Sequence, residues 1–268
     1  MFEEMNITEK LHAIDQLCRR NGGIPGVPLW IPAGAKIVRS VRGHGKNTLS
    51  ELTYKPAECC KNYMRATLPN ETAFYGCIGD DPHPTDAYSK ARVMSLAECS
   101  SSFRIAMKPT EDEKYTTSVW RANRQIQAIC FITADTFPST HGETIDKIRE
   151  VYEKNVNDHK YSQKQIELLA EINKEFTKIV ESGHELEYMI TANLCHSCLY
   201  APDTDGIQNE AVVYASVQTS GELGLNVAIR PDVADEFLIL DHVIEQTYDT
   251  QCNLRFVPKE LSSIDMYS

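Results

Sequence analysis

The stretch VVYASVQTSGELGLNVAIRP, residues 212–231, sets our expectation for the fold. It holds two apolar runs rich in valine and isoleucine, separated by a polar segment, and residues of this kind favour buried β-strands. We therefore predict strands over 210–218 and 225–231. A lone Ser216 follows the first apolar run, so the sequence places a hydroxyl group at the end of a predicted strand.

Other segments with β-forming composition lie on both sides of this pair. They are AKIVRSV (35–41), TAFYGCI (72–78), FRIAMK (103–108), QAICFITA (127–134), DEFLILDHVIEQTYD (235–249) and NLRFVP (253–258). We expect each to form a strand because valine, isoleucine, phenylalanine and tyrosine are enriched in sheets. The segment ARVMSLAECSS (91–101) also fits the apolar spacing of a helix, which would then carry Glu98.

Helical periodicity marks two further parts of the chain. Asn6 and Glu9 have capping-box spacing at the start of an amphipathic segment, and the glycine- and proline-rich residues that follow are typical of a surface connector. A second helical block extends from about 140 to 200. The sequence therefore predicts a mixed α/β (α+β) fold, with a helix and connector at 1–34 and a main domain at 35–268 that contains the helical insertion.

Charge and hydropathy exclude several classes of function. The chain has 38 acidic and 27 basic residues, a formal net charge of −11, so we expect no nucleic-acid partner. No signal-like segment and no run of about eighteen apolar residues is present, so we expect a cytoplasmic protein that does not bind to a membrane. Nine scattered cysteines indicate reduced thiols.

Local motifs for metal, nucleotide or nucleophilic chemistry are weak. Cys195 and Cys198 have C-x-x-C spacing, but no second pair completes a four-ligand zinc site, so we interpret them as core residues and expect no metal. No histidine lies in an H-E-x-x-H frame. The glycines at 43–45 and 221–224 fit neither a dinucleotide-binding loop nor a P-loop, which excludes the common nucleotide-binding folds.

Four motifs in a fixed order carry a more specific signal. They are KIVRSV (36–41), YMRATLPNETAFYG (63–76), ARVMSLAE (91–98) and EAVVYASVQTSGELGLNVAIRP (210–231). In this order the chain resembles the RES domain family, over about residues 35–240. The resemblance places the family's arginine, glutamate and serine on Arg39, Glu98 and Ser216, a second arginine on Arg65 and a tyrosine on Tyr75.

The resemblance implies an ADP-ribosyltransferase-like β core and an enzyme that consumes NAD as a substrate, with no other cofactor. Glu98 would stabilise the positive charge that develops on the ribose when the nicotinamide bond breaks. Arg39 and Arg65 would hold the pyrophosphate, Tyr75 would stack on nicotinamide, and Ser216 would orient the substrate. The implied activity is that of an NAD glycohydrolase or phosphorylase, a toxin of a toxin–antitoxin pair.

Alternatives stay open at this point. The same ribosyl cation can be transferred to a protein, and a chain with this fold can also act as a non-catalytic binding protein. The resemblance also leaves open whether the chain binds an antitoxin protein and whether it forms a homo-oligomer. The sequence departs from the family at Ser40, Met64 and Ala215, where a tyrosine, a glycine and a proline are usual, and its helical insertion is longer than a compact member needs.

Overall fold

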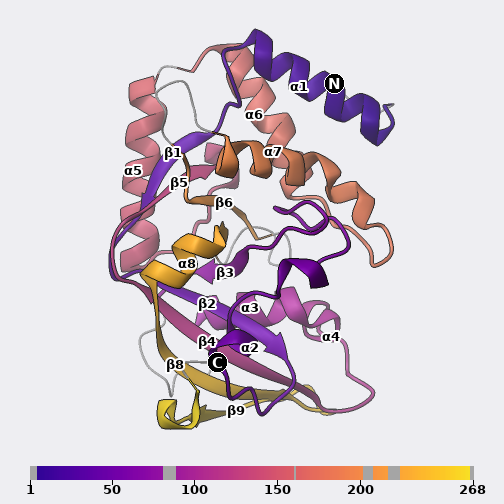
Figure 1. The fold of residues 1–268 in the computed structure, drawn as a ribbon, viewed down its shortest axis with the longest axis vertical. Helices are drawn as coiled ribbons and strands as arrows, with labels where there is room; N and C mark the ends of the chain where they lie inside the picture. Colours follow the sequence, from indigo (N-terminus) through magenta and orange to yellow (C-terminus); the bar gives the residue numbers. More distant parts are fainter. Residues whose placement is uncertain (1–4, 81–88, 160, 202–207, 217–223, 266–268) are drawn as a thin grey trace.

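The computed structural model describes residues 5–80, 89–159, 161–201, 208–216 and 224–265. These residues form a mixed α/β architecture around one sheet of nine strands, in the order β1-β5-β6-β7-β3-β2-β4-β8-β9 (Figure 1). The strands are β1 (Val27–Ile31), β2 (Lys36–Arg42), β3 (Phe74–Ile78), β4 (Glu113–Ala122), β5 (Ile126–Cys130), β6 (Ala211–Ala215), β7 (Leu225–Ile229), β8 (Leu238–Tyr248) and β9 (Leu254–Lys259). The predicted mixed α/β class is confirmed.

Helices pack against strands across most of this sheet. The α-helices are α1 (Ile7–Arg20), α2 (Leu49–Leu52), α3 (Lys90–Cys99), α4 (Ser101–Arg104), α5 (Glu143–His159), α6 (Gln163–Phe176), α7 (Met189–Tyr200) and α8 (Pro231–Phe237). In Figure 1, α1, α6 and α7 gather at one end of the molecule, and β8 and β9 lie at the other. Of the described residues, none belongs to a helix that is long and apolar enough to span a bilayer.

Strands β6 and β7 confirm the prediction made from residues 212–231. They pair in antiparallel fashion from Ala211 opposite Ile229 to Ala215 opposite Leu225, and every residue of both strands is buried. Continuous burial explains why the two runs are apolar without alternation. Residues 217–223, at the end of the first predicted strand and in the segment between the two, lie outside the described part of the chain.

The sheet divides in the middle, between β2 and β3. Their ladder contains two residue pairs, Ile37 with Ile78 and Val38 with Cys77. Beyond Val38 the two strands no longer pair, although β2 continues to pair with β4 as far as Arg42. This split separates the five strands from β1 to β3 from the four strands from β2 to β9, and it creates space between them.

A glycine makes the close approach beside the split possible. A Cβ atom on Gly76 would lie 2.5 Å from Ile37 Cγ2 and 3.3 Å from the Val38 carbonyl oxygen. We expect Gly76→Ala to lower the free energy of unfolding by about 1–3 kcal/mol, because the extra methyl group overpacks a rigid interface. Urea unfolding measures this loss, and an unchanged midpoint would show that β2 and β3 can separate further at no cost.

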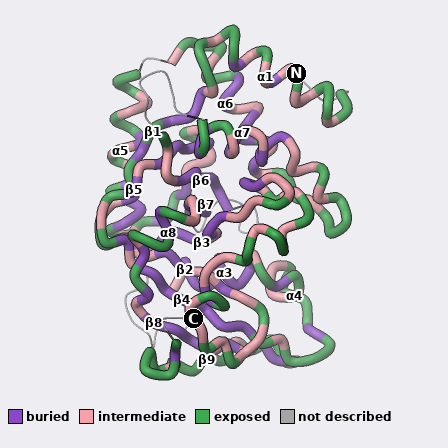
Figure 2. Tube along the Cα trace, in the orientation of Figure 1, coloured by how far each residue is buried: buried purple, intermediate pink, exposed green. Residues whose placement is uncertain are grey.

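Residues 140–200 contain the helices α5, α6 and α7, as predicted, and these helices share the core of the sheet. Ser162 caps α6 within a capping box, and outside this block Asn6 caps α1 in the same way. The buried faces of α6 and α7 pack on β6, and one apolar cluster continues from Ile14 of α1 through these helices to Ile264 near the C-terminus. Figure 2 shows this continuity as buried residues that run from the strands into the inner faces of the helices.

Two predictions about secondary structure were wrong. FRIAMK (103–108) is not a strand, because Ser100 caps α4 by accepting the Phe103 amide and the apolar side chains of Ile105 and Met107 stay exposed. The predicted connector at 21–34 contains β1, which pairs with β5. In β1 the burial alternates, with Val27, Leu29 and Ile31 inside, a pattern that the neighbouring prolines and glycines conceal.

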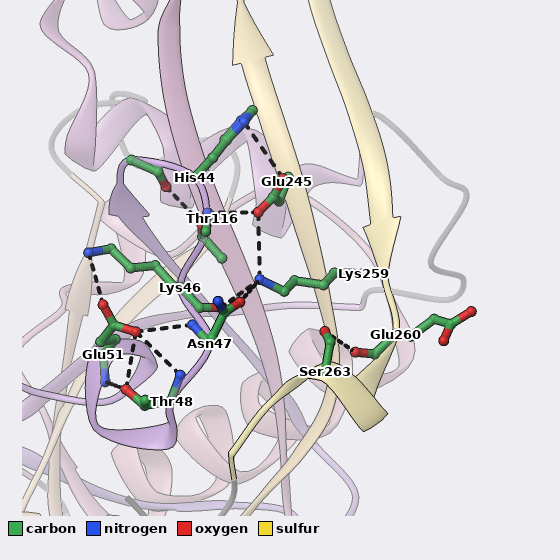
Figure 3. Close-up of polar contacts among 12 residues, drawn as sticks. His44, Lys46, Asn47, Thr48, Glu51, Thr116, Glu245, Lys259, Glu260 and Ser263 are labelled. Atoms are coloured by element: carbon green, nitrogen blue, oxygen red, sulfur yellow. Dashed lines mark hydrogen bonds and ion pairs between the residues drawn. The ribbon is translucent and has the colours of Figure 1, made fainter.

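Polar contacts fix the outer end of β2 to the far edge of the sheet (Figure 3). Lys259 of β9 donates to the main-chain carbonyl of Lys46 at 2.8 Å and lies 3.6 Å from a carboxylate oxygen of Glu245. The Gly45 amide donates to the same carboxylate at 2.8 Å. This hydrogen bond is the main reason why the pKa of Glu245 is lowered. The turn after Arg42 is therefore held in place from β8 and β9.

Candidate functional site

A cavity of about 460 Å³ lies at the split in the sheet. The residues that would continue the ladder between β2 and β3 line it instead, among them Arg39 and Ser40 on one side and Tyr75 and Gly76 on the other. Other parts of its lining come from α3, from β6 and β7, from the loop before β3, and from the residues between α6 and α7. Elements from both halves of the sheet therefore meet at one site.

Glu98 contributes a carboxylate to this cavity from the last turn of α3, the helix that the sequence allowed. Two donors share one of its oxygens: the Ser216 hydroxyl at 3.0 Å and the Asn226 side-chain amide at 2.7 Å from Oε1. Neither of these bonds uses Oε2. Because both donors address the same oxygen, the carboxylate is held in one orientation and its second oxygen is left for other contacts.

Asn226 is a site residue to which the sequence reasoning gave no role. It lies on β7, is buried, and lines the cavity; its side-chain carbonyl accepts a bond from the Cys77 thiol at 3.2 Å. Cys77 thus sets which end of the amide faces Glu98. The signal was present in LNVAIRP (225–231), where a polar residue interrupts a run that is otherwise apolar up to its arginine.

Ser216 is placed by the strand that precedes it. It follows directly after β6, is 1% exposed, and its hydroxyl reaches across to α3. Ala215 pairs with Leu225 in the ladder between β6 and β7. The structure therefore brings Ser216 and Glu98 together, although they are separated by 118 positions.

Arg39 extends into the split from β2. Its Nη1 donates to the Tyr75 carbonyl oxygen at 2.8 Å, and its guanidinium carbon lies 5.7 Å from the centre of the Phe74 ring. The buried Nε makes no hydrogen bond to any described residue. Burial lowers the pKa of Arg39 from its usual value. A buried guanidinium with a spare donor is well suited to bind an anion that enters the cavity.

Tyr75 lines the cavity beside Arg39, but its hydroxyl is engaged by the protein. The hydroxyl accepts the Ala66 amide at 3.1 Å and lies 3.1 Å from the Thr67 hydroxyl. Burial, the largest cause, raises the pKa of Tyr75 far above its usual value, so the phenol stays protonated. Tyr75 can therefore offer its ring to a ligand, whereas its hydroxyl fixes the loop that carries Arg65.

Arg65 lines the cavity too, yet its terminal nitrogens bind main-chain carbonyls. Nη1 donates to the carbonyl of Phe176 and Nη2 to that of Lys178 at 3.1 Å. The guanidinium also lies over the Tyr188 ring, 4.8 Å from its centre. The structure thus connects Arg65 to the helical insertion. Met64, the residue before Arg65, is 45% exposed at the same cavity.

Ser40, the departure next to Arg39, has a structural role. Its hydroxyl accepts from Ser95 of α3 at 2.9 Å and lies 2.8 Å from the Thr117 hydroxyl of β4. The Cys99 thiol donates to the Ser40 carbonyl at 3.0 Å. These contacts hold α3 against β2 and so fix the position of Glu98.

The charge of the cavity is opposite to that of the chain. Its lining includes five cationic side chains and one carboxylate, that of Glu98. The cations are Arg39, Arg42, Lys55, Arg65 and Arg104. In a protein with a net charge of −11, this concentration of positive charge favours an anionic ligand.

Thiol or metal chemistry has little support among the described residues. Burial, the main cause, raises the pKa of the cavity-lining Cys77 well above its usual value. Cys77 is therefore a protonated thiol at neutral pH and a poor nucleophile. Cys195 and Cys198 are buried in α7. No group of three or more metal-ligating side chains occurs within the described ranges.

A scan against protein-family models, a search of curated proteins and a search of solved structures each found no match to this chain.

Proposed function

We propose that this protein consumes NAD by breaking the bond between nicotinamide and ribose. The observation that carries the proposal is the double anchoring of Glu98 Oε1 by Ser216 and Asn226, within a cavity that is otherwise cationic. An isolated, oriented carboxylate among cations suits a substrate that carries phosphates and develops positive charge at one carbon atom. The ordered motifs that resemble the RES family point to the same substrate.

The chemistry needs one carboxylate and no strong acid. When the bond from ribose C1′ to the nicotinamide nitrogen breaks, its electron pair moves to the nitrogen, and nicotinamide leaves as a neutral molecule. The positive charge stays on the ribosyl carbon and its ring oxygen, where Glu98 stabilises it electrostatically. Attack by water then gives ADP-ribose and a proton, and attack by phosphate gives ADP-ribose 1″-phosphate.

The other residues bind and orient the substrate in this proposal. Arg39 binds the pyrophosphate through Nε, which donates to no described residue of the protein. Tyr75 offers its ring to nicotinamide, and Ser216 and Asn226 act through Glu98 as positioning residues. Arg65 does not bind the pyrophosphate in this proposal, because its terminal nitrogens bind main-chain carbonyls. Its charge contributes only to the electrostatic field of the cavity. The proposal includes an ADP-ribosyltransferase-like arrangement of the sheet and a cytoplasmic location.

The direct test is to incubate the purified chain with NAD, with and without phosphate, and to separate the products. We expect loss of NAD with release of an equal amount of nicotinamide; a product that changes when phosphate is added identifies the acceptor. Label from adenine-labelled NAD that becomes attached to protein would instead identify ADP-ribosyl transfer. If the wild-type protein neither releases nicotinamide nor binds NAD or ADP-ribose, the proposal is wrong, and a non-catalytic binding protein becomes the better interpretation.

A further inference from the structure

The connection between α6 and α7 forms one wall of the cavity. Val180 and Tyr188 line the cavity from this connection, which includes residues 177–188 and ends in a short 3-10 helix, Glu185–Tyr188. An ion pair between Lys178 and Glu187, with 2.5 Å between Nζ and Oε2, joins the two ends of the connection. The helical insertion therefore contributes directly to the candidate site.

Arg65 fastens this wall to the loop before β3. Its two terminal nitrogens bind carbonyl groups at the end of α6 and just beyond it, and its planar guanidinium packs on the ring of Tyr188. Tyr188 is half-buried, and part of its surface belongs to the cavity. An aromatic ring held against a guanidinium is rigid, and its exposed surface is available for stacking.

The chemical character of this wall differs from that of the part of the lining that β2 contributes. The cations Arg39 and Arg42 lie on β2, whereas the connection places Val180 and the Tyr188 ring against the cavity. Ile179 and Leu186 of the same connection are exposed apolar side chains. A site with a cationic side and an apolar, aromatic side fits a ligand with phosphates at one part and a flat base at another.

We propose that Tyr188 is a substrate-binding residue, on which one of the two heteroaromatic bases of the dinucleotide stacks. This inference rests on the proposed function. Two other tyrosines line the cavity: Tyr214 is 4% exposed and packs 5.4 Å from the Phe176 ring, and Tyr75 already has a ring contact in the proposed function. Ser40 on β2 has a hydroxyl group that accepts a hydrogen bond from Ser95, and it offers no aromatic ring to the cavity. Tyr188 is thus the aromatic surface that the insertion adds.

The test uses the two reaction products, because each contains one base. Calorimetric titration of wild type, Tyr188→Leu and Tyr188→Phe with ADP-ribose and with nicotinamide reports the adenine end and the nicotinamide end separately. Leucine keeps apolar bulk but removes the planar ring, so we expect Tyr188→Leu to weaken binding of one product about tenfold or more. Tyr188→Phe keeps the ring and is expected to bind as the wild type does. The product that is affected identifies the base.

Tyr200→Leu is the matched control, because Tyr200 lies in the same insertion, is 40% exposed and does not line the cavity. Its affinities should equal those of the wild type. Equal affinities of Tyr188→Leu and wild type for both products would overturn the inference and leave the proposed function intact, as would a loss in Tyr188→Phe as large as that in Tyr188→Leu. If the wild type binds neither product, the proposed function itself fails and this inference fails with it.

Discussion

Replacement of Glu98 by glutamine is expected to reduce nicotinamide release by at least about 10³-fold, which corresponds to about 4 kcal/mol of transition-state stabilisation. The substitution removes the charge and little else. A glutamine side-chain oxygen can still accept the bonds from Ser216 and Asn226, which lie 3.0 and 2.7 Å from Oε1. The loss of rate therefore measures the electrostatic contribution of the carboxylate to the developing ribosyl cation.

In the Glu98→Gln variant, we expect the affinity for ADP-ribose and the rate of nicotinamide release to respond differently. Because Glu98 is the single carboxylate among the described residues that line a cationic cavity, its neutralisation should leave the affinity for ADP-ribose unchanged or increase it. Glu150→Gln, an exposed position on α5, is the control and should keep the wild-type rate. An active wild type with an equally active Glu98→Gln variant would remove Glu98 from the mechanism. A large fall in ADP-ribose affinity would instead show that the variant has disturbed the cavity.

The sequence predicted those parts of the fold in which the pattern of apolar residues matches the secondary structure. The runs at 212–215 and 225–229 became the buried strands β6 and β7, and helix α1 formed where the capping box of Asn6 and Glu9 predicted it. Strand β4 shows the opposite case. Thr116, Thr117 and Ser118 are buried in it, with their hydroxyls bonded within the sheet, so one of the longest strands has a polar sequence that no hydrophobic pattern reveals.

The candidate site was only partly accessible, for a different physical reason. Arg39, Tyr75, Glu98 and Ser216 were selected by motif order, and the structure gathers them at one cavity or directly beside it. Their convergence depends on the split between β2 and β3, which is a property of strand pairing over long distances and leaves no local signature. For the same reason, the sequence could not show that Arg65 binds the helical insertion or that Tyr188 reaches the cavity.

The helices of residues 143–200 share an apolar core with the sheet, so we expect both to unfold together, and Phe176→Ala tests this most strongly. Phe176 ends α6, is fully buried, and stacks on Phe131 with 5.0 Å between ring centres and 11° between ring planes. It also packs 5.4 Å from the ring of Tyr214 in β6. Its truncation should lower the free energy of unfolding by about 3–5 kcal/mol, because it leaves a cavity between the helix and the sheet.

The measurement is thermal unfolding, followed both by far-ultraviolet circular dichroism and by tryptophan fluorescence. Trp120 lies in β4, on the other side of the split from α6, and is buried, so its signal, isolated by replacing Trp30 of β1 with phenylalanine in every variant, reports the sheet. We expect both signals to shift together to lower temperature in Phe176→Ala. Ile166→Ala is the control, since Ile166 lies on the same helix at 47% exposure and its truncation should cost little. A helical transition that moves while the tryptophan transition stays in place would show that the insertion folds separately. The wall that Arg65 fastens would then be independent of the sheet that holds Glu98.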